Sequence, residues 1–227
     1  MTPMSASAAS LVQLLDLQHP PVAVTFGTEP DDLTGEGIPA QPAGCCFWEP
    51  AQRQRLDTRG ADHANCSVGS YTHGFTDLAS AAAGSDTAAL INSGWIAPSD
   101  FASVAHLPIR PSTIRYEPLS DATDPDVVLI RLSPTSLMTL QGACPEMRLT
   151  TKPQCQIIPR AHSGQIAVSP GCAVSRARTG LPADEVTCAL PGGSLEALID
   201  RLRQSVAADQ AVVDYATNER ERFSALS

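Results

Sequence analysis

The chain has 227 residues and a formal net charge of −9, with one lysine and fourteen arginines among its basic residues. This acidic balance and the absence of a basic stripe argue against a nucleic-acid partner. No apolar stretch approaches the roughly 20 residues that a membrane-spanning helix needs, so we expect no membrane span. The N-terminus lacks the features of a secretory signal, so we expect a cytoplasmic protein whose thiols stay reduced.

The first half contains few elements with a clear periodicity. We predict a helix at 8–17, a strand at 22–26, a helix at 48–56 and a helix at 78–83. Residues 88–93 fit either the end of a helix or a short apolar strand. Two loops, 27–44 and 57–74, are predicted to deliver the first three cysteines.

The second half is more regular. Ser133 and Pro134 are typical of a helix N-terminus, and Ser194 is predicted to cap another helix. The predicted elements are strands at 126–132, 154–158, 165–169 and 186–190, and helices at 134–141, 195–206 and 208–223, the last with Val212, Val213 and Tyr215 against the body. Strands and helices without strict alternation favour an α+β fold, a mixed sheet with flanking helices. We expect one two-lobed domain, divided into about 1–118 and 119–227.

Seven cysteines are the most informative feature of the chain, and none lies in a C-x-x-C pair. Thiols brought from separated loops in a reducing compartment suggest a metal or cluster site. The odd count and the length of the chain argue against a disulfide framework. The seven are Cys45, Cys46, Cys66, Cys144, Cys155, Cys172 and Cys188.

Several short motifs resemble those of the domain-of-unknown-function family 169. They include Gly44-Cys-Cys-Phe-Trp-Glu-Pro-Ala51, His63-Ala-Asn-Cys-Ser-Val-Gly69, Lys152-Pro-Gln-Cys-Gln156 and Ser169-Pro-Gly-Cys-Ala-Val-Ser-Arg176. The resemblance covers nearly the whole chain, although Ala173 stands where the family more usually has glycine. It implies no settled activity. Its recurrent cysteines match Cys46 (or Cys45), Cys66, Cys155 and Cys172, whereas Cys144 and Cys188 are additions of this sequence.

We therefore predict that Cys46, Cys66, Cys155 and Cys172 hold a [4Fe-4S] cluster. Dispersed single cysteines favour a cluster over structural zinc, whose ligands usually come in close-spaced pairs. Only one of Cys45 and Cys46 is expected to bind, and the sequence does not choose between them. Cys144, followed by Met147, is an alternative soft-metal ligand that would suit copper.

Four further residues are candidates for catalysis. Arg176, with Ser175 beside it, is placed to hold a substrate carboxylate, and Arg178 would serve equally well. His63 and His73 flank Cys66 and are predicted to move a proton or to support the cluster. Trp48 and Trp95 are expected in the core or at a pocket rim.

Three functions fit this pattern. The first is an iron-sulfur enzyme whose open iron acts as a Lewis acid in non-redox elimination or desulfuration of a small carboxylate-bearing substrate. The second is a non-catalytic protein that binds, delivers or senses zinc, copper or haem. The third is a metal-free thiol enzyme with Cys45, Cys46 or Cys172 as nucleophile and a histidine base. Neither the oligomeric state nor the substrate follows from the sequence.

Overall fold

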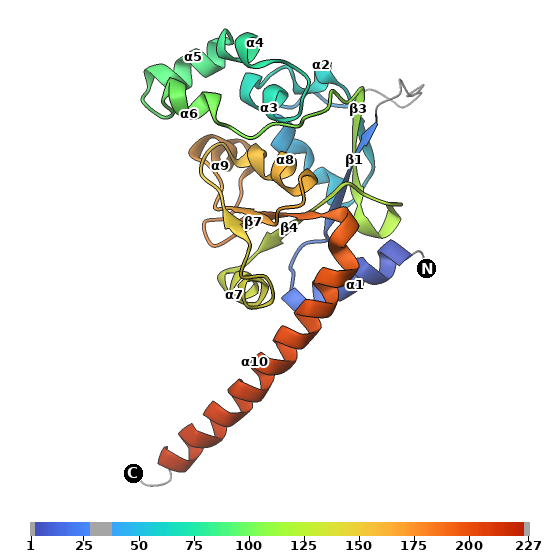
Figure 1. Ribbon diagram of the computed structural model, residues 1–227, viewed down its shortest axis with the longest axis vertical. Coiled ribbons are helices and arrows are strands. Elements are labelled where there is room, and N and C mark those ends of the chain that lie inside the picture. Colours follow the sequence, from blue (N-terminus) through green and yellow to red (C-terminus); the bar gives the residue numbers. More distant parts are fainter. Residues whose placement is uncertain (1–2, 28–37, 225–227) are drawn as a thin grey trace.

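The computed structural model describes residues 3–27 and 38–224. Its centre is a seven-stranded mixed sheet in the order β2-β3-β1-β4-β7-β6-β5 (Figure 1). All neighbouring strands are antiparallel except β5 and β6, which are parallel. The strands are β1 (Val22–Gly27), β2 (Leu56–Thr58), β3 (Thr113–Pro118), β4 (Val127–Leu132), β5 (Arg148–Leu149), β6 (Ala167–Ser169) and β7 (Val186–Pro191).

Helices cover both faces of this sheet and form an additional group beside it, which confirms the α+β prediction. The α-helices are α1 (Pro3–Leu15), α2 (Gly60–His63), α3 (Ser67–Thr72), α4 (Leu78–Ala82), α5 (Ser85–Asn92), α6 (Pro98–Ala102), α7 (Pro134–Ala143), α8 (Ile157–His162), α9 (Ala173–Thr179) and α10 (Leu195–Ser224). Short 3₁₀ turns complete the fold: η1 (Gly44–Phe47), η2 (Pro50–Gln52), η3 (Leu119–Asp121), η4 (Gln154–Gln156) and η5 (Gly192–Ser194).

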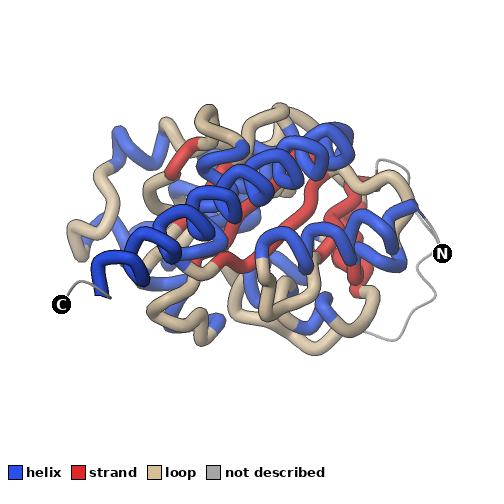
Figure 2. Tube along the Cα trace, turned by 90° about the horizontal axis from the view of Figure 1, so that it is seen from below, coloured by secondary structure: helices blue, strands red, loops and turns tan. Residues whose placement is uncertain are grey.

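The sequence of strand β4 is a continuous aliphatic run because both faces of the strand are buried. Successive side chains of a strand point to opposite faces, and both faces of β4 are covered. Val128 and Ile130 belong to a core formed with α1, α7 and α10. Val127 and Leu129 belong to a second core formed with η1, η2 and α8. Figure 2 shows α1 and α10 lying across the same face of the sheet.

The helices α3 to α6 form a third apolar cluster, visible as a separate group at the top of Figure 1. Val68, Tyr71 and Phe101 are buried in it, and Cys155 joins it from η4. Because Cys66 contacts both this cluster and the η1–α8 core, the boundary between the two is where cysteines from distant parts of the chain can meet.

Two predicted segments of the first half differ from the structure, and a third lies largely outside its described residues. The helix expected at 48–56 is a 3₁₀ turn followed by β2, because Leu56 pairs with Tyr116 of β3. The loop expected at 57–74 contains α2 and α3. Of the loop predicted at 27–44, residues 28–37 lie outside the described part of the chain.

Three predictions in the second half were also wrong, two of them about secondary structure. The strand expected at 154–158 is η4 and the start of α8, where Ile157, Ile158 and Ala161 share one helical face against the sheet. The two C-terminal helices are one continuous helix, α10, since no glycine or proline interrupts them.

The second half of α10 extends away from the body (Figure 1). Val212, Val213 and Tyr215 are 65%, 55% and 64% exposed, so they do not pack against the body as predicted. This helix is long but rich in charged residues, and within the described residues no helix has the length and apolar character needed to cross a membrane.

Candidate cysteine-lined site

Four cysteines from four separate segments line one cavity of about 270 Å³. Cys45 comes from η1, Cys66 from the residue before α3, Cys155 from η4 and Cys172 from the residue before α9. Three of these side chains are buried and Cys66 is half-buried. The structure thus brings together cysteines that are up to 127 positions apart in the sequence, and we call this space the thiol cavity.

Two of these sulfurs accept hydrogen bonds from the first turns of helices. Cys66 Sγ lies 3.4 Å from Gly69 N, and Cys172 Sγ lies 3.3 Å from Ser175 N. In both cases the cysteine occupies the N-cap position with an extended backbone. Backbone N–H donors at sulfur are among the contacts through which proteins tune cluster-bound thiolates.

A buried hydrogen-bond network fixes the segments that carry Cys155 and Cys172. The Ser175 hydroxyl lies 2.8 Å from Gln154 Oε1 and 2.9 Å from the Cys172 carbonyl oxygen, and it accepts a hydrogen bond from Cys172 N at 3.0 Å. Ser175 and Gln154 are 3% and 2% exposed. Ser175 was predicted to act on substrate. In the structure it lines the thiol cavity and holds the segments that carry Cys155 and Cys172.

The adjacent cysteines Cys45 and Cys46 have different surroundings. Cys45 lines the thiol cavity, whereas the half-buried Cys46 directs its Sγ toward the Arg178 carbonyl oxygen, 3.8 Å away. A hydrogen bond from the Cys45 thiol lowers the pKa of Cys46 to about 7 and, together with burial, raises the pKa of Cys45 well above its ordinary value. Of the two, Cys45 is therefore the one placed with Cys66, Cys155 and Cys172.

Cys155 is one of the three buried cysteines of the set. Burial raises its pKa, and the nearby Cys66 and Cys172 sulfurs act in the same direction. These effects oppose the accumulation of negative charge unless a cation neutralises it. The Cys155 thiol therefore ionises readily only when a cation, such as a metal ion, binds beside it.

The rings of His63 and His73 pack against Gly44 of η1, and neither residue lines the thiol cavity. Their ring centroids are 5.1 Å apart, and both side chains are fully buried. Burial lowers the pKa of both, that of His73 to about 4. The predicted proton-transfer groups are thus neutral side chains enclosed beneath the segment that carries Cys45.

The hydrogen bonds of these two histidines indicate their tautomers. His73 Nδ1 lies 2.7 Å from the Gly69 carbonyl oxygen, so Nδ1 carries the proton. Because the Thr58 hydroxyl donates to the Ile114 carbonyl, it accepts from His63 Nε2 at 2.9 Å. The other two ring nitrogens, His63 Nδ1 and His73 Nε2, are buried and have no hydrogen-bond partner among the described residues.

Arg176 and Arg178 differ in how their guanidinium groups are used. Arg176 donates to the backbone carbonyls of four residues and so holds the loop around α9 together; these are Pro170, Leu181, Pro182 and Glu185. Arg178 lines the thiol cavity instead. Of the two arginines considered from the sequence, Arg178 is the one placed beside the thiols.

The remaining cysteines lie elsewhere. Cys144 and Cys188 are fully buried in the core on the α1, α7 and α10 side of the sheet, with Met147 packed against it. Burial raises the pKa of both thiols, that of Cys144 to about 11. They are separated from the thiol cavity by the sheet, so they provide internal controls for it.

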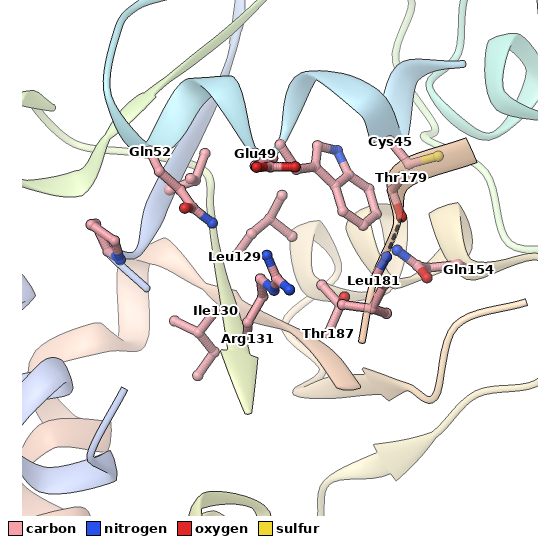
Figure 3. Close-up of a pocket in the computed structure, with 13 residues that line it drawn as sticks. Cys45, Glu49, Gln52, Leu129, Ile130, Arg131, Gln154, Thr179, Leu181 and Thr187 are labelled. Atoms are coloured by element: carbon pink, nitrogen blue, oxygen red, sulfur yellow. Dashed lines mark hydrogen bonds between the residues drawn. The ribbon is translucent and has the colours of Figure 1, made fainter. Parts of the chain in front are cut away.

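A second, smaller cavity of about 40 Å³ adjoins the first (Figure 3). Cys45 and Gln154 contribute to the walls of both cavities. Arg131 points into the smaller one from β4, and its Nε lies 2.6 Å from Glu185 Oε2. Trp48 lines this cavity and Trp95 lines the thiol cavity, which agrees with their predicted place at a core or rim.

Two polar residues of the thiol cavity were not selected from the sequence. Gln154 lies in the Lys152-Pro-Gln-Cys-Gln156 motif, so its position next to a candidate ligand was an available signal. Asp86 also lines the cavity, and its Oδ2 accepts a hydrogen bond from Ser67 N at 2.9 Å. Nothing in the local sequence around Asp86 indicates this role.

The four thiols are not arranged around a single point. Within the described ranges, no three His, Cys, Asp or Glu side chains converge closely enough to hold one metal ion. The site is therefore a cavity with cysteines on its walls, and not a preformed mononuclear centre.

These features define an α+β protein with a cavity walled by dispersed cysteines. The chain belongs to the DUF169 family, described as "Uncharacterised ArCR", whose model matches residues 10–201. The match confirms the resemblance inferred from the cysteine motifs, and the projecting part of α10 lies beyond it. Neither a curated protein nor a solved structure shows significant similarity to the chain.

Proposed function

We propose that this protein binds a [4Fe-4S] cluster in the thiol cavity through Cys45, Cys66, Cys155 and Cys172. The observation that carries the proposal is that these four residues line one cavity of about 270 Å³. The proposal differs from the sequence-based ligand set only at its first member, where Cys45 replaces Cys46.

Thiols on the walls of one cavity suit a polynuclear centre better than a single ion. A structural zinc ion needs ligand sulfurs about 2.3 Å from one point, and no three such donors converge among the described residues. A cluster carries its iron atoms at its corners, so its ligands are distributed around a larger volume. Zinc and copper are therefore the weaker alternatives for this cavity.

The surroundings also suit a cluster. The N–H groups of Gly69 and Ser175 donate to two of the sulfurs, and the Ser175–Gln154 hydrogen bond holds two ligand segments in place. Burial makes a free Cys155 thiolate unfavourable. Bound iron would offset this cost, since a metal binds the deprotonated thiol.

The cavity extends from a buried interior to the surface. Cys45, Cys155 and Cys172 are buried, whereas Leu90 and Trp95 on the same walls are half-buried. A bound cluster would therefore be accessible to a small molecule from one side. A cluster that a small molecule can reach is compatible with the non-redox lyase or desulfidase reaction that we propose.

The direct test is anaerobic purification of the full chain followed by iron and acid-labile sulfide analysis and absorption spectroscopy. We expect iron and sulfide in the wild type and their loss in Cys66→Ala and Cys172→Ala. Cys144→Ala and Cys188→Ala are matched controls because both thiols are buried on the other side of the sheet. Equal iron content in all five proteins would refute the proposal.

A metal-free thiol function is a second candidate, favoured by Cys46. Its side chain is half-buried, and its pKa is lowered to about 7, so a large fraction is ionised at neutral pH. Iodoacetamide labelling of the iron-free protein would show a rate that rises around pH 7 and is lost in Cys46→Ser. This function would replace the cluster proposal only if the anaerobic protein contains no iron.

A further inference from the structure

Arg178 has an unusual position among the arginines near the thiol cavity. It is half-buried in the last turn of α9 and lines the cavity directly. Within the part of the chain that the structure describes, its guanidinium group makes no hydrogen bond or ion pair. By contrast, Arg176 is bound by backbone carbonyls and Arg131 by Glu185.

The charge of Arg178 lowers the pKa of the nearby Cys46 thiol. Its guanidinium donors are still not used by any hydrogen bond among the described residues, so they are suited to bind an anion. The guanidinium group presents five donors in a planar fork that matches the two oxygens of a carboxylate. Because the whole chain carries a net charge of −9, a local cation at the cavity would be needed to retain an anionic ligand.

The walls near Arg178 indicate what else the ligand would contain. Leu90, Trp95 and Val174 are half-buried and provide apolar surface in the outer part of the cavity. Asp86 also lines the cavity, but its carboxylate is held by Ser67 N. The complementary ligand thus has one negative group for Arg178 and a short apolar chain.

We propose that Arg178 binds the carboxylate of a small organic acid in the outer part of the thiol cavity, with the apolar chain of the acid against Trp95 and Leu90. This inference deepens the proposed function and rests on it, because the acid would lie beside the cluster as its substrate. It assigns carboxylate recognition to Arg178 and leaves Arg176 with a positioning role in the loop.

The test compares butanoate with butanamide, which has nearly the same shape but no charge. Binding to the anaerobically purified full-length protein is followed by saturation-transfer NMR, with iron and sulfide measured on the same samples. We expect butanoate to bind at least about tenfold more tightly than butanamide. Arg178→Gln should abolish that difference and keep the iron content. Arg148→Gln, a change at an exposed arginine on β5, should preserve both.

The possible failures are distinguishable. Equal affinities for butanoate and butanamide in an iron-containing wild type would overturn the acid site and leave the cluster proposal intact. Loss of iron in Arg178→Gln would also overturn it, because the arginine would then serve the cluster itself. If the wild type contains no iron but discriminates between the probes through Arg178, the carboxylate site stands and the cluster proposal fails.

Discussion

The Ser175 hydroxyl donates a hydrogen bond to Gln154 Oε1 at 2.8 Å and thereby joins two cysteine-bearing segments that are distant in sequence. Ser175 belongs to α9, three residues after Cys172, and Gln154 directly precedes Cys155. Both side chains are almost completely buried. This hydrogen bond between neutral side chains is therefore one of the contacts that fix the relative position of these two thiols.

Removal of this bond should weaken both the fold and cluster binding. We expect Ser175→Ala to lower the free energy of unfolding by about 1 to 3 kcal/mol, because a buried Gln154 oxygen loses its donor. Iron content after anaerobic purification should also fall. Ser136→Ala is the control, since Ser136 is equally buried but lies in α7. It should lose stability without losing iron, and equal iron loss in both variants would contradict the positioning role.

Gly44 is required by the close approach of η1 to the buried histidines. A Cβ atom at this position would lie 2.5 Å from His63 Nδ1. We expect Gly44→Ala to destabilise the protein by more than about 2 kcal/mol, because overpacking forces a shift of the segment that carries Cys45. Gly193→Ala is the matched control, since no atom lies within 4 Å of its added Cβ. Urea denaturation of both variants measures the difference, and similar midpoints would contradict this account.

The buried histidines predict a loss of stability in weak acid. The folded-state pKa of His73 is about 4 against an ordinary value of 6.5, because of its burial. Above pH 6.5 the side chain is neutral in both states. As pH falls from 6.5 to 4, the unfolded chain binds the proton first, so stability is lost across this window.

Between pH 7 and pH 4, His73 should lower the free energy of unfolding by about 3 kcal/mol, and His63 acts in the same direction. Urea unfolding of the iron-free protein at several pH values measures it. His73→Gln should flatten the profile, because glutamine binds no proton in this range. A profile that is flat in the wild type would show that these histidines are not buried as described.

The amino-acid sequence predicted the parts of the fold that depend on local pattern. Strand β4 and the N-cap Ser133 of α7 were placed within one residue, because an aliphatic run and a Ser-Pro pair are local signals. Strand β3 was missed, and β2 was divided between the end of a predicted helix and the start of a predicted loop, because these strands are specified by their pairing with each other. Ile157 and Ile158 favour a strand locally, but packing against the sheet keeps them helical.

The same distinction applies to the site. Cys66, Cys155 and Cys172 were predicted as ligands because each lies in a loop-like motif of Gly, Pro or Ser, and the structure places all three on the walls of one cavity. Their role as ligands stays a prediction. The choice between Cys45 and Cys46 depends on how η1 is oriented, which neighbouring residues in the sequence do not reveal. The burial of His63 and His73 likewise results from tertiary packing, in which η1 approaches both rings at Gly44.

The exposed half of α10 should contribute little to the stability of the body. Leu202 is its last buried residue, and the family match ends at residue 201. We expect deletion of residues 208–227 to change the free energy of unfolding by less than about 1 kcal/mol, because few contacts are lost. Urea denaturation at two protein concentrations checks this. A large loss of stability that depends on protein concentration would contradict this prediction, because it would mean that the helix stabilises an assembly of several chains.

Iron and acid-labile sulfide in the anaerobically purified protein, compared between Cys45→Ala and Cys46→Ala, test the central claim most directly. The two residues are adjacent, but only Cys45 lines the thiol cavity. We predict that Cys45→Ala loses its iron and sulfide, whereas Cys46→Ala retains both. Retention of a full cluster in Cys45→Ala, or the absence of iron from the wild type, would contradict it.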